Sequence, residues 1–205
     1  MIVHGLEAIA DCSTIRSAVL VVPDSHVDTT RQVAAEFGLD TIVEALVTGG
    51  RSRQESVRLG LAAVPLDVQL IVCHDAARPL ASPDLFDRVV EALDRGEGAV
   101  PVVASVDTVK RIREGRVIET IPRNEVGLVQ TPQAFVASAL REAHRRASAD
   151  GLEATDDAML LEAAGFRVVA VDGEPMNLKV TTMQDLRLAE RVLDDRARVP
   201  RGPTH

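Results

Sequence analysis

The sequence is poor in aromatic side chains, with no Trp, no Tyr and only four Phe. Few platforms are therefore available on which the bases of single-stranded nucleic acid would stack. The formal net charge of -8 and the sequence pI of about 5.1 also disfavour a broad nucleic-acid surface. We expect no nucleic-acid partner, although a local basic pocket would still accept a small phosphorylated substrate.

Cysteine is equally scarce, and long apolar runs are missing. Cys12 and Cys73 have neither metal-ligand nor redox spacing, so reduced thiols are expected. No apolar run approaches the length that crosses a membrane, and residues 1–6 lack the basic start and long apolar core of a secretory signal. We expect a cytoplasmic protein without a membrane partner.

Lysine is the rarest kind of charge in the chain. Lys110 and Lys179 are the two lysines among 23 basic residues, and all the others are arginine. Such a bias suggests that Lys is kept where a compact ammonium does something that Arg cannot do. The alternative is chance, because two residues are a small sample.

The apolar pattern alternates between strands and helices along most of the 205 residues. We predict strands at residues 17–22, 41–47, 68–73, 98–103 and 167–171, and helices at residues 2–11, 28–37, 53–63, 83–94, 134–147, 156–164 and 183–195. This order predicts an α/β fold with a Rossmann-like, mostly parallel, twisted sheet and helices on both faces. We expect one domain over residues 1–195 and a loose tail over residues 196–205.

The alternation breaks at residues 106–130. Two strand-like pieces, residues 106–112 and 116–121, flank the turn Glu114-Gly115 and predict a projecting β-hairpin arm. Such an arm often contacts a second subunit. The alternative is a hairpin that covers a sheet edge.

Two loops that follow predicted strands carry polar residues suited to a phosphorylated ligand. Gly49-Gly50 lets the backbone approach closely, and the helix after it offers N–H groups beside the donors Arg51, Arg53 and Ser56. The second loop, His74-Asp75-Ala76-Ala77-Arg78-Pro79, places a carboxylate and a guanidinium three positions apart. Ligands gather beyond the carboxyl ends of strands in such sheets. Ordinary strand-ending turns remain the alternative for both loops.

Thr155-Asp156-Asp157 precedes the helix expected at residues 156–164. For the two Asp residues we favour a role in capping that helix. A metal site is the less favoured interpretation.

Six blocks in this order resemble one known family. The blocks are Gly49-Gly50 with Arg53 and Ser56-Val57, His74 to Pro79, Asp107 to Arg111, Thr131-Pro132-Gln133, Thr155 to Ala158, and Asn177 to Thr181. From about residue 2 to residue 193 the chain resembles the 2-C-methyl-D-erythritol 4-phosphate cytidylyltransferases of the non-mevalonate isoprenoid pathway. The resemblance implies transfer of CMP from CTP to the phosphate of the alcohol, with release of pyrophosphate.

The resemblance also implies residue roles. Contacts to the nucleotide would come from Gly49, Gly50, Arg51, Ser56, Asp75 and Ala76. Contacts to the alcohol phosphate would come from Arg78, Thr108, Arg123 and Thr131. Asp75 would hold Mg²⁺ between triphosphate oxygens. Lys179 and Arg78 would be catalytic, Lys179 by neutralising charge on the α-phosphate. In relatives the arm residues reach the partner subunit's site, which implies a homodimer; Lys110, also on the arm, is given a structural role.

The chain departs from the family pattern in two places. Met176 stands where many relatives carry Asp, which puts a second carboxylate in doubt. Relatives also begin with a strand, a glycine-rich loop that bears an Arg, and a Pro-Lys pair, none of which precedes residue 2 here. That strand would lie between the strands at 17–22 and 68–73 and satisfy their buried backbone groups. We therefore expect that Met1 is an internal methionine of a longer protein, and that the N-terminally truncated chain is weakly active or inactive.

Two alternatives stay open at this point. The first is a related sugar-alcohol-phosphate cytidylyltransferase, for instance one that uses ribitol 5-phosphate. The second is a non-catalytic remnant that binds nucleotide or a complete subunit.

Overall fold

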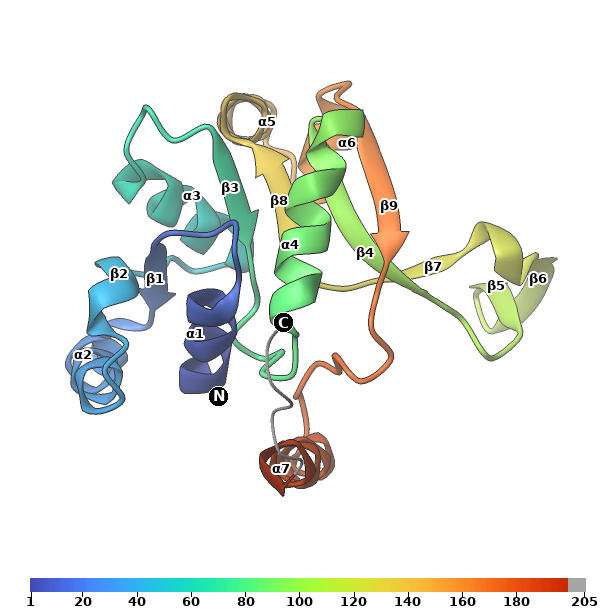
Figure 1. The fold of residues 1–205 in the computed structure, drawn as a ribbon. Coiled ribbons are helices and arrows are strands. Elements are labelled where there is room, and N and C mark those ends of the chain that lie inside the picture. The colour runs from blue at the N-terminus through green and yellow to red at the C-terminus, as the bar shows by residue number, and fades with distance from the viewer. Residues whose placement is uncertain (199–205) are drawn as a thin grey trace.

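The strands form two separate groups beside a projecting arm in the computed structural model, which describes residues 1–198 (Figure 1). The first group is the parallel pair β1 (Ala18–Val22) and β2 (Val43–Thr48). The second group has the order β3-β8-β4-β7, with β9 paired to β4. Its bounds are β3 Leu70–Cys73, β4 Gly98–Ala104, β7 Gly127–Val129, β8 Gln133–Val136 and β9 Val168–Asp172. Strands β3, β4 and β9 run one way, whereas β7 and β8 run the other way.

The α/β fold class is confirmed, and the largest error among the predicted helices is at residues 134–147. The helix predicted at residues 134–147 begins as strand β8, and helix α5 covers Ala137–Asp150. Gln133, Ala134 and Phe135 are buried between β3 and β4. Strand pairing in the core thus overrides the local pattern of this short apolar segment. Strand β7, which pairs with β4, was also not predicted.

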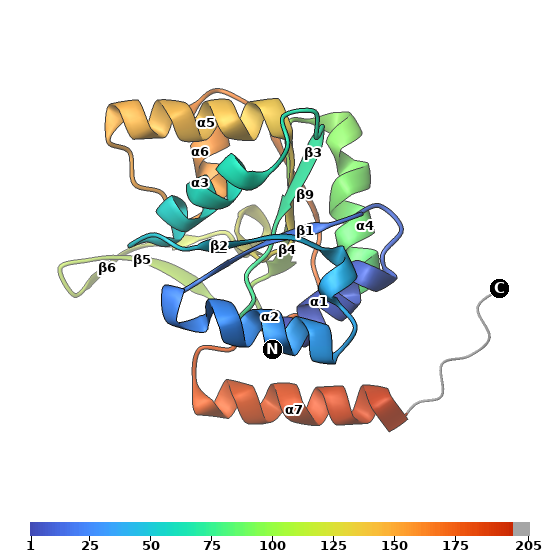
Figure 2. The same cartoon turned by 90° about the vertical axis from the view of Figure 1, so that its left-hand side faces the viewer.

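Helices cover both faces of the larger sheet (Figure 2). The bounds are α1 Ile2–Asp11, α2 Val27–Glu36, α3 Arg53–Ala63, α4 Pro83–Glu91, α5 Ala137–Asp150, α6 Asp157–Ala163 and α7 Met183–Arg198. Helices α5 and α6 pack on Val100 and Phe135, while α4 packs on the other face against Ala99 and Ala134. Adjacent residues of β4 and β8 therefore point into opposite layers, as expected for a sheet buried on both faces.

Helix α7 lies below the rest of the fold in Figure 2. It continues to Arg198, three residues beyond the predicted end at 195, so the first part of the expected tail is helical. Arg196 donates from Nη2 to the carbonyl oxygen of Leu80 at 3.0 Å. The rest of the tail, residues 199–205, lies outside the described residues.

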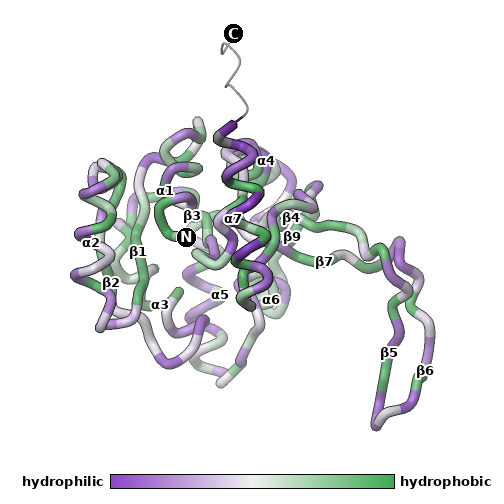
Figure 3. The backbone as a smooth tube through the Cα atoms, turned by 90° about the horizontal axis from the view of Figure 1, so that it is seen from below, coloured by the Kyte–Doolittle hydropathy of each residue, from purple (hydrophilic) through white to green (hydrophobic). Residues whose placement is uncertain are grey.

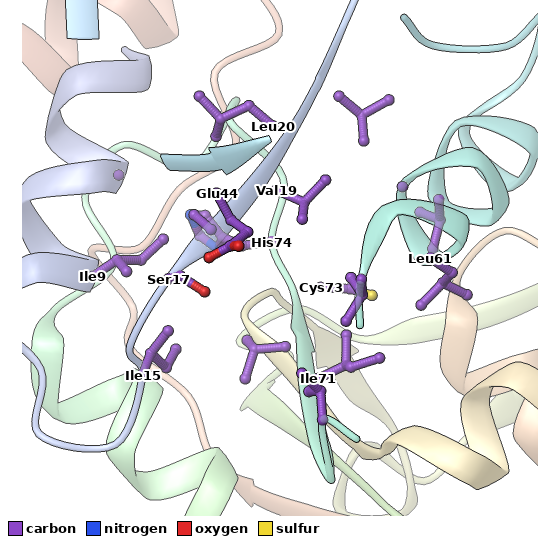
Figure 4. A pocket seen from close by; sticks show the side chains of 18 of the residues that line it. Ile9, Ile15, Ser17, Val19, Leu20, Glu44, Leu61, Ile71, Cys73 and His74 are labelled. Atoms are coloured by element: carbon purple, nitrogen blue, oxygen red, sulfur yellow. The ribbon is translucent and has the colours of Figure 1, made fainter. Parts of the chain in front are cut away.

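Strands β1 and β3 are separated by a cavity of about 790 Å³ (Figure 4). Val19 and Leu20 of β1 line one side, and Ile71 and Cys73 of β3 line the other. Within residues 1–198, β1 pairs with β2 alone and β3 pairs with β8 alone. The facing edges of the two strands therefore carry no ladder hydrogen bonds, as was expected for residues 17–22 and 68–73.

The predicted hairpin is confirmed as β5 (Val109–Arg113) and β6 (Arg116–Ile121). Its turn, Glu114-Gly115, has φ values of 49° and 75°. Two consecutive positive φ values are typical of the tight turns that join twisted strands. The arm projects away from the body of the molecule (Figures 1 and 3). In the described part of the chain it forms a separate two-stranded sheet, so it does not cover an edge of another sheet.

Among residues 1–198, each helix is too short or too polar to span a membrane.

Candidate active site

A pocket of about 240 Å³ lies beyond the carboxyl end of β3. Strand β3 ends at Cys73, and the loop that follows supplies Asp75 and Arg78 to the pocket. The other lining residues come from α3, from the segment around β7 and β8, from the start of α6 and from the segment before α7: Arg53, Val129, Gln130, Thr131, Gln133, Thr155, Asp156 and Lys179. Segments that are distant in sequence therefore meet at one sheet edge.

Asp75 lies between two cations. Its Oδ1 accepts a hydrogen bond from Arg53 Nε at 3.1 Å, and its Oδ2 accepts one from Lys179 Nζ at 2.8 Å. Burial alone would raise the pKa of Asp75, but the Lys179 hydrogen bond and the Arg53 charge outweigh it and hold that pKa below its usual range. Asp75 is therefore a carboxylate at neutral pH, and it brings Lys179 to the pocket.

Arg78 is fixed by backbone carbonyl groups. Its Nη1 donates to the carbonyl oxygen of Asn177 at 2.7 Å, and its backbone N–H donates to Asp75 O at 2.8 Å. Burial lowers the pKa of Arg78 from its ordinary value, although an Arg stays charged at neutral pH. Its Nε is buried and has no hydrogen-bond partner in the described residues.

Thr131 and His74 hold the loop that carries Asp75 and Arg78. The backbone N–H of Asp75 donates to Thr131 Oγ1 at 3.0 Å, and His74 Nδ1 lies 3.3 Å from the same oxygen. His74 Nε2 lies 3.2 Å from Arg78 O. Burial lowers the pKa of His74 to about 4, so its ring is neutral at pH 7. Thr131, predicted as a substrate ligand, lines the pocket but is only 5% exposed.

Side chains of helix α3 satisfy N–H groups of the glycine loop. The Gly50 N–H donates to Ser56 Oγ at 3.0 Å, and the Arg51 N–H donates to Glu55 Oε2 at 2.7 Å. The N–H groups predicted to be available are those at the start of the helix, and one of them, that of Glu55, donates to Ser52 Oγ at 3.1 Å. A Cβ at residue 50 would lie 2.2 Å from the Glu55 side chain, which explains the glycine there. The Arg51 side chain is 97% exposed.

The predicted site residues fall into four groups. Asp75, Arg78, Thr131 and Lys179 line the pocket of about 240 Å³. Ser56 and Ala76 line the larger cavity, whereas Gly49, Gly50 and Arg51 form the loop before α3. Thr108 and Arg123 are exposed on the arm and are not among the residues that line either cavity. Within one chain, the described structure does not bring these two residues to Asp75.

Arg53 was predicted as a donor of the glycine loop, but its two carboxylate partners were not predicted, and Asp157 was misassigned. Asp156 caps α6, because its side chain accepts from Met159 N at 3.0 Å. Asp157 instead forms an ion pair with Arg53 at 2.8 Å and lies 3.0 Å from His144. The prediction that both Asp residues cap α6 is therefore wrong for Asp157. Arg53 and Asp157 each stand in a block that resembles the family, whereas no sequence signal marked His144.

The two lysines separate as expected from their positions. Lys179 reaches Asp75, whereas Lys110 donates to Thr120 Oγ1 at 2.6 Å across the hairpin of the arm.

Two carboxylates line the pocket, but Asp156 already accepts hydrogen bonds from Met159 N and Gln133 Nε2, so Asp75 is the candidate ligand for a divalent metal. Among the described residues there is no group of three or more His, Cys, Asp or Glu side chains arranged to hold a metal ion. Met176 is exposed and supplies no carboxylate. Asp75 provides a hard oxygen at the pocket, which fits an ion such as Mg²⁺ that keeps most of its ligands from phosphates and water.

Comparison with known proteins identifies the same family. A family model described as 2-C-methyl-D-erythritol 4-phosphate cytidylyltransferase matches residues 1–195. A protein of that name from Thermosynechococcus vestitus is 47% identical over 152 residues, which are 74% of this chain and 65% of the relative. The chain thus spans less than two thirds of that relative's length. A second, from Bacillus velezensis, is 38% identical over 194 residues, 94% of this chain and 83% of the relative.

Solved structures agree in fold. The crystal structure of the enzyme of that name from Thermus thermophilus is 37% identical and has a TM-score of 0.79, covering 93% of this chain and 87% of that one. A 4-diphosphocytidyl-2C-methyl-D-erythritol synthase from Anaerococcus prevotii is 29% identical with a TM-score of 0.87, covering 94% and 85%. These matches extend over nearly the whole sequence, and the chain therefore belongs to the 2-C-methyl-D-erythritol 4-phosphate cytidylyltransferase family.

Proposed function

We propose that the chain transfers CMP from CTP to 2-C-methyl-D-erythritol 4-phosphate and releases pyrophosphate, a step in isoprenoid precursor synthesis. The observation that carries the proposal is the position of Asp75 between Arg53 and Lys179, with Arg78 in the same pocket. Several cations around one carboxylate suit a ligand with many negative oxygens. The names of the relatives supply the identity of the two substrates.

The reaction would proceed by displacement at phosphorus. An oxygen of the alcohol phosphate forms a bond to the α-phosphorus of CTP, and the bond from that phosphorus to the bridging oxygen of pyrophosphate breaks. Such transfers depend on alignment and on stabilisation of charge on the phosphoryl oxygens. Lys179 and Arg78 supply positive charge in this proposal. The Lys179 side chain is 44% exposed, so its ammonium group is accessible to a ligand.

Mg²⁺ is the proposed metal, and Asp75 is the residue that would hold it. The ion would neutralise charge on the triphosphate and help to orient it. Lys179 Nζ bonds to Asp75 Oδ2 in the present structure. With Asp75 holding the ion, Lys179 would be free to bind the phosphates.

The arm suggests how Thr108 and Arg123 would contribute. Both are exposed on a projecting segment, as are the apolar side chains of Ile112 and Val117, at 64% and 62%. Exposed apolar residues on an extension favour burial against a second surface. We propose that two copies of the chain form a homodimer through the arms, and that each arm delivers Thr108 and Arg123 to the partner subunit's alcohol-phosphate site.

The domain limits and the location follow the sequence expectations. We propose one nucleotidyltransferase domain over residues 1–195, and a cytoplasmic location in keeping with two free thiols, Cys12 and Cys73.

Measurement of pyrophosphate release tests the proposal. We expect slow release from CTP when methylerythritol phosphate and Mg²⁺ are present, and background release when ribitol 5-phosphate replaces the alcohol. Equal or faster release with ribitol 5-phosphate would support the other sugar-alcohol substrate. Binding of CTP without any release would support the non-catalytic remnant.

A further inference from the structure

A row of four side chains connects helix α5 with the pocket. His144 Nε2 lies 3.0 Å from Asp157 Oδ1, and Asp157 Oδ2 accepts from Arg53 Nη1 at 2.8 Å. The Nε atom of the same guanidinium donates to Asp75 Oδ1 at 3.1 Å. Arg53 is therefore held on one side by Asp157 and holds Asp75 on the other. A guanidinium with two carboxylate partners on different edges has one defined orientation.

The four residues differ in their access to the pocket. The side chains of Asp157 and His144 are 1% and 3% exposed, so neither can contact a ligand in the pocket. The Arg53 side chain is 32% exposed and lines that pocket. The hydrogen bond between Arg53 and Asp157 therefore links the buried pair to the pocket.

The local backbone explains why Arg53 needs this support. Arg53 is the first residue of α3, where the positive end of the helix dipole disfavours a cation. Asp157 is the first residue of α6, where the same effect favours an anion. The dipole of α6 thus stabilises the charge of Asp157, and Asp157 in turn stabilises the charge of Arg53, which the dipole of α3 disfavours.

His144 adds a constraint at a cost. Its Nδ1 atom is buried without a hydrogen-bond partner among the described residues. An unsatisfied buried polar atom is destabilising. An apolar side chain at position 144 would avoid this cost, so packing alone does not explain a histidine there. The gain on the other side of the ring is the bond from Nε2 to Asp157.

We propose that Asp157, oriented by His144, is a positioning residue that fixes Arg53 and, through Arg53, sets the orientation of the Asp75 carboxylate. The consequence for turnover rests on the proposed function. With Asp157 in place, Arg53 binds one oxygen of Asp75 and leaves the other to Lys179 or to a metal. Without it, the guanidinium is free to turn and take both oxygens.

The orientation of Arg53 can be measured without turnover. In ¹⁵N-labelled protein the Arg53 Nε–H signal is assigned by its loss in Arg53→Lys, and its hydrogen exchange is followed. We expect exchange to accelerate by about ten-fold or more in Asp157→Asn, because local opening becomes easier. The matched control is Glu162→Gln, which removes the same charge from an exposed position of α6. Unchanged exchange in a folded Asp157→Asn protein would overturn the proposal.

A second pair of variants covers the case in which Asp157→Asn does not fold. His144→Leu removes the bond to Asp157 but keeps the charges of Arg53, Asp157 and Asp75. His144→Gln restores a donor at a similar position. We expect faster Arg53 exchange in His144→Leu and recovery in His144→Gln. Loss of stability in both, with no change in Arg53 exchange, would show a purely structural role and overturn the proposal.

Turnover then tests the catalytic consequence. Misplaced catalytic groups lower rates by about 10²-fold for a shift of 1 Å, so kcat should fall up to that amount in Asp157→Asn while KM for CTP changes little. In an Arg53→Gln background the Asp157→Asn change should have no further effect. If the losses of kcat in Arg53→Gln and Asp157→Asn multiply in the double variant, the two residues act independently and the proposal is overturned. If the unaltered chain releases no pyrophosphate, the proposed function fails, and Arg53 exchange still decides the positioning role.

Discussion

Asp75 shows how one residue acquires its properties from distant parts of the chain. Its cationic partners, Arg53 and Lys179, are 22 and 104 residues away in sequence. The sequence predicted Asp75, Arg78 and Lys179 as site residues, and these three do meet in one pocket. The buried pair behind Arg53 could not be predicted, because Asp157 and Arg53 are 104 residues apart and no local pattern marks such a contact.

Substitution of Lys179 by Ala tests the proposed role of its ammonium group. Loss of one charge-stabilising donor at a transferring group costs about 10²–10³-fold in kcat, and we expect a fall of that size. Pyrophosphate release with CTP and methylerythritol phosphate is the measurement. Lys110→Ala is the matched control, because it removes the other lysine, which bonds to Thr120 on the arm. Equal activity in both variants would remove Lys179 from the mechanism.

His74 makes the stability of the fold depend on pH. Burial lowers its pKa from 6.5 to about 4, so between these values the unfolded chain binds a proton that the folded chain does not. Stability therefore falls as the pH drops from 6.5 to 4, by up to about 3 kcal/mol at 1.36 kcal/mol per unit.

Urea unfolding of the chain and of His74→Gln at pH 7 and pH 4.5 isolates this contribution. The unaltered chain should lose more stability than the variant over this interval. An equal loss in both proteins would show that the His74 ring is not held neutral by the fold.

At the scale of elements, turn residues and helix-start residues predicted the secondary structure more reliably than short apolar runs did. The Glu114-Gly115 turn marks the hairpin, and the predicted start of a helix at residue 83 is confirmed by α4, which Ser82 caps and Pro83 begins. Residues 133–136 form a strand because β3 and β4 lie on either side of them, which is a tertiary effect. Strand β7, three residues long, is likewise defined by its partner β4.

The arm offers a direct test of the proposed dimer. Ile112 and Val117 are directly paired across the hairpin, so their exposed side chains share one apolar patch. Replacing both with Asp should weaken self-association on the order of 10³-fold, since buried hot-spot residues contribute about 2 kcal/mol or more each. Sedimentation over a range of protein concentrations measures the change.

Leu66→Asp is the control for this experiment, because Leu66 is 88% exposed and lies outside the arm. A chain that is monomeric before any substitution, or a dimer that survives both Asp residues, would contradict association through the arm.

At the scale of the whole molecule, the main irregularity is the cavity between β1 and β3. The cavity has a volume of about 790 Å³ and an apolar lining. It separates two groups of strands that otherwise form one α/β layer. The sequence resemblance predicted unpaired edges at these two strands. The size of the cavity required the structure, because it depends on how α1, α3 and α4 surround the gap.

An added strand should stabilise the fold. We expect a higher melting temperature when an apolar segment of strand length is joined to Met1 through a flexible linker, because it can pair with both free edges. Each new backbone hydrogen bond contributes about 0.5–1.5 kcal/mol, and each kcal/mol raises Tm by about 2–4 °C at this chain length. A segment of equal length made of Gly and Ser is the control. The same melting temperature for both segments would contradict this account of the cavity.

The central claim is that this chain carries out the reaction for which its family is named. Pyrophosphate release from CTP, measured with and without methylerythritol 4-phosphate, tests it most directly. The account predicts release that requires the alcohol phosphate, is slow in the 205-residue chain and disappears in Lys179→Ala. Release that stays at the level of CTP alone, or that Lys179→Ala leaves unchanged, would contradict it.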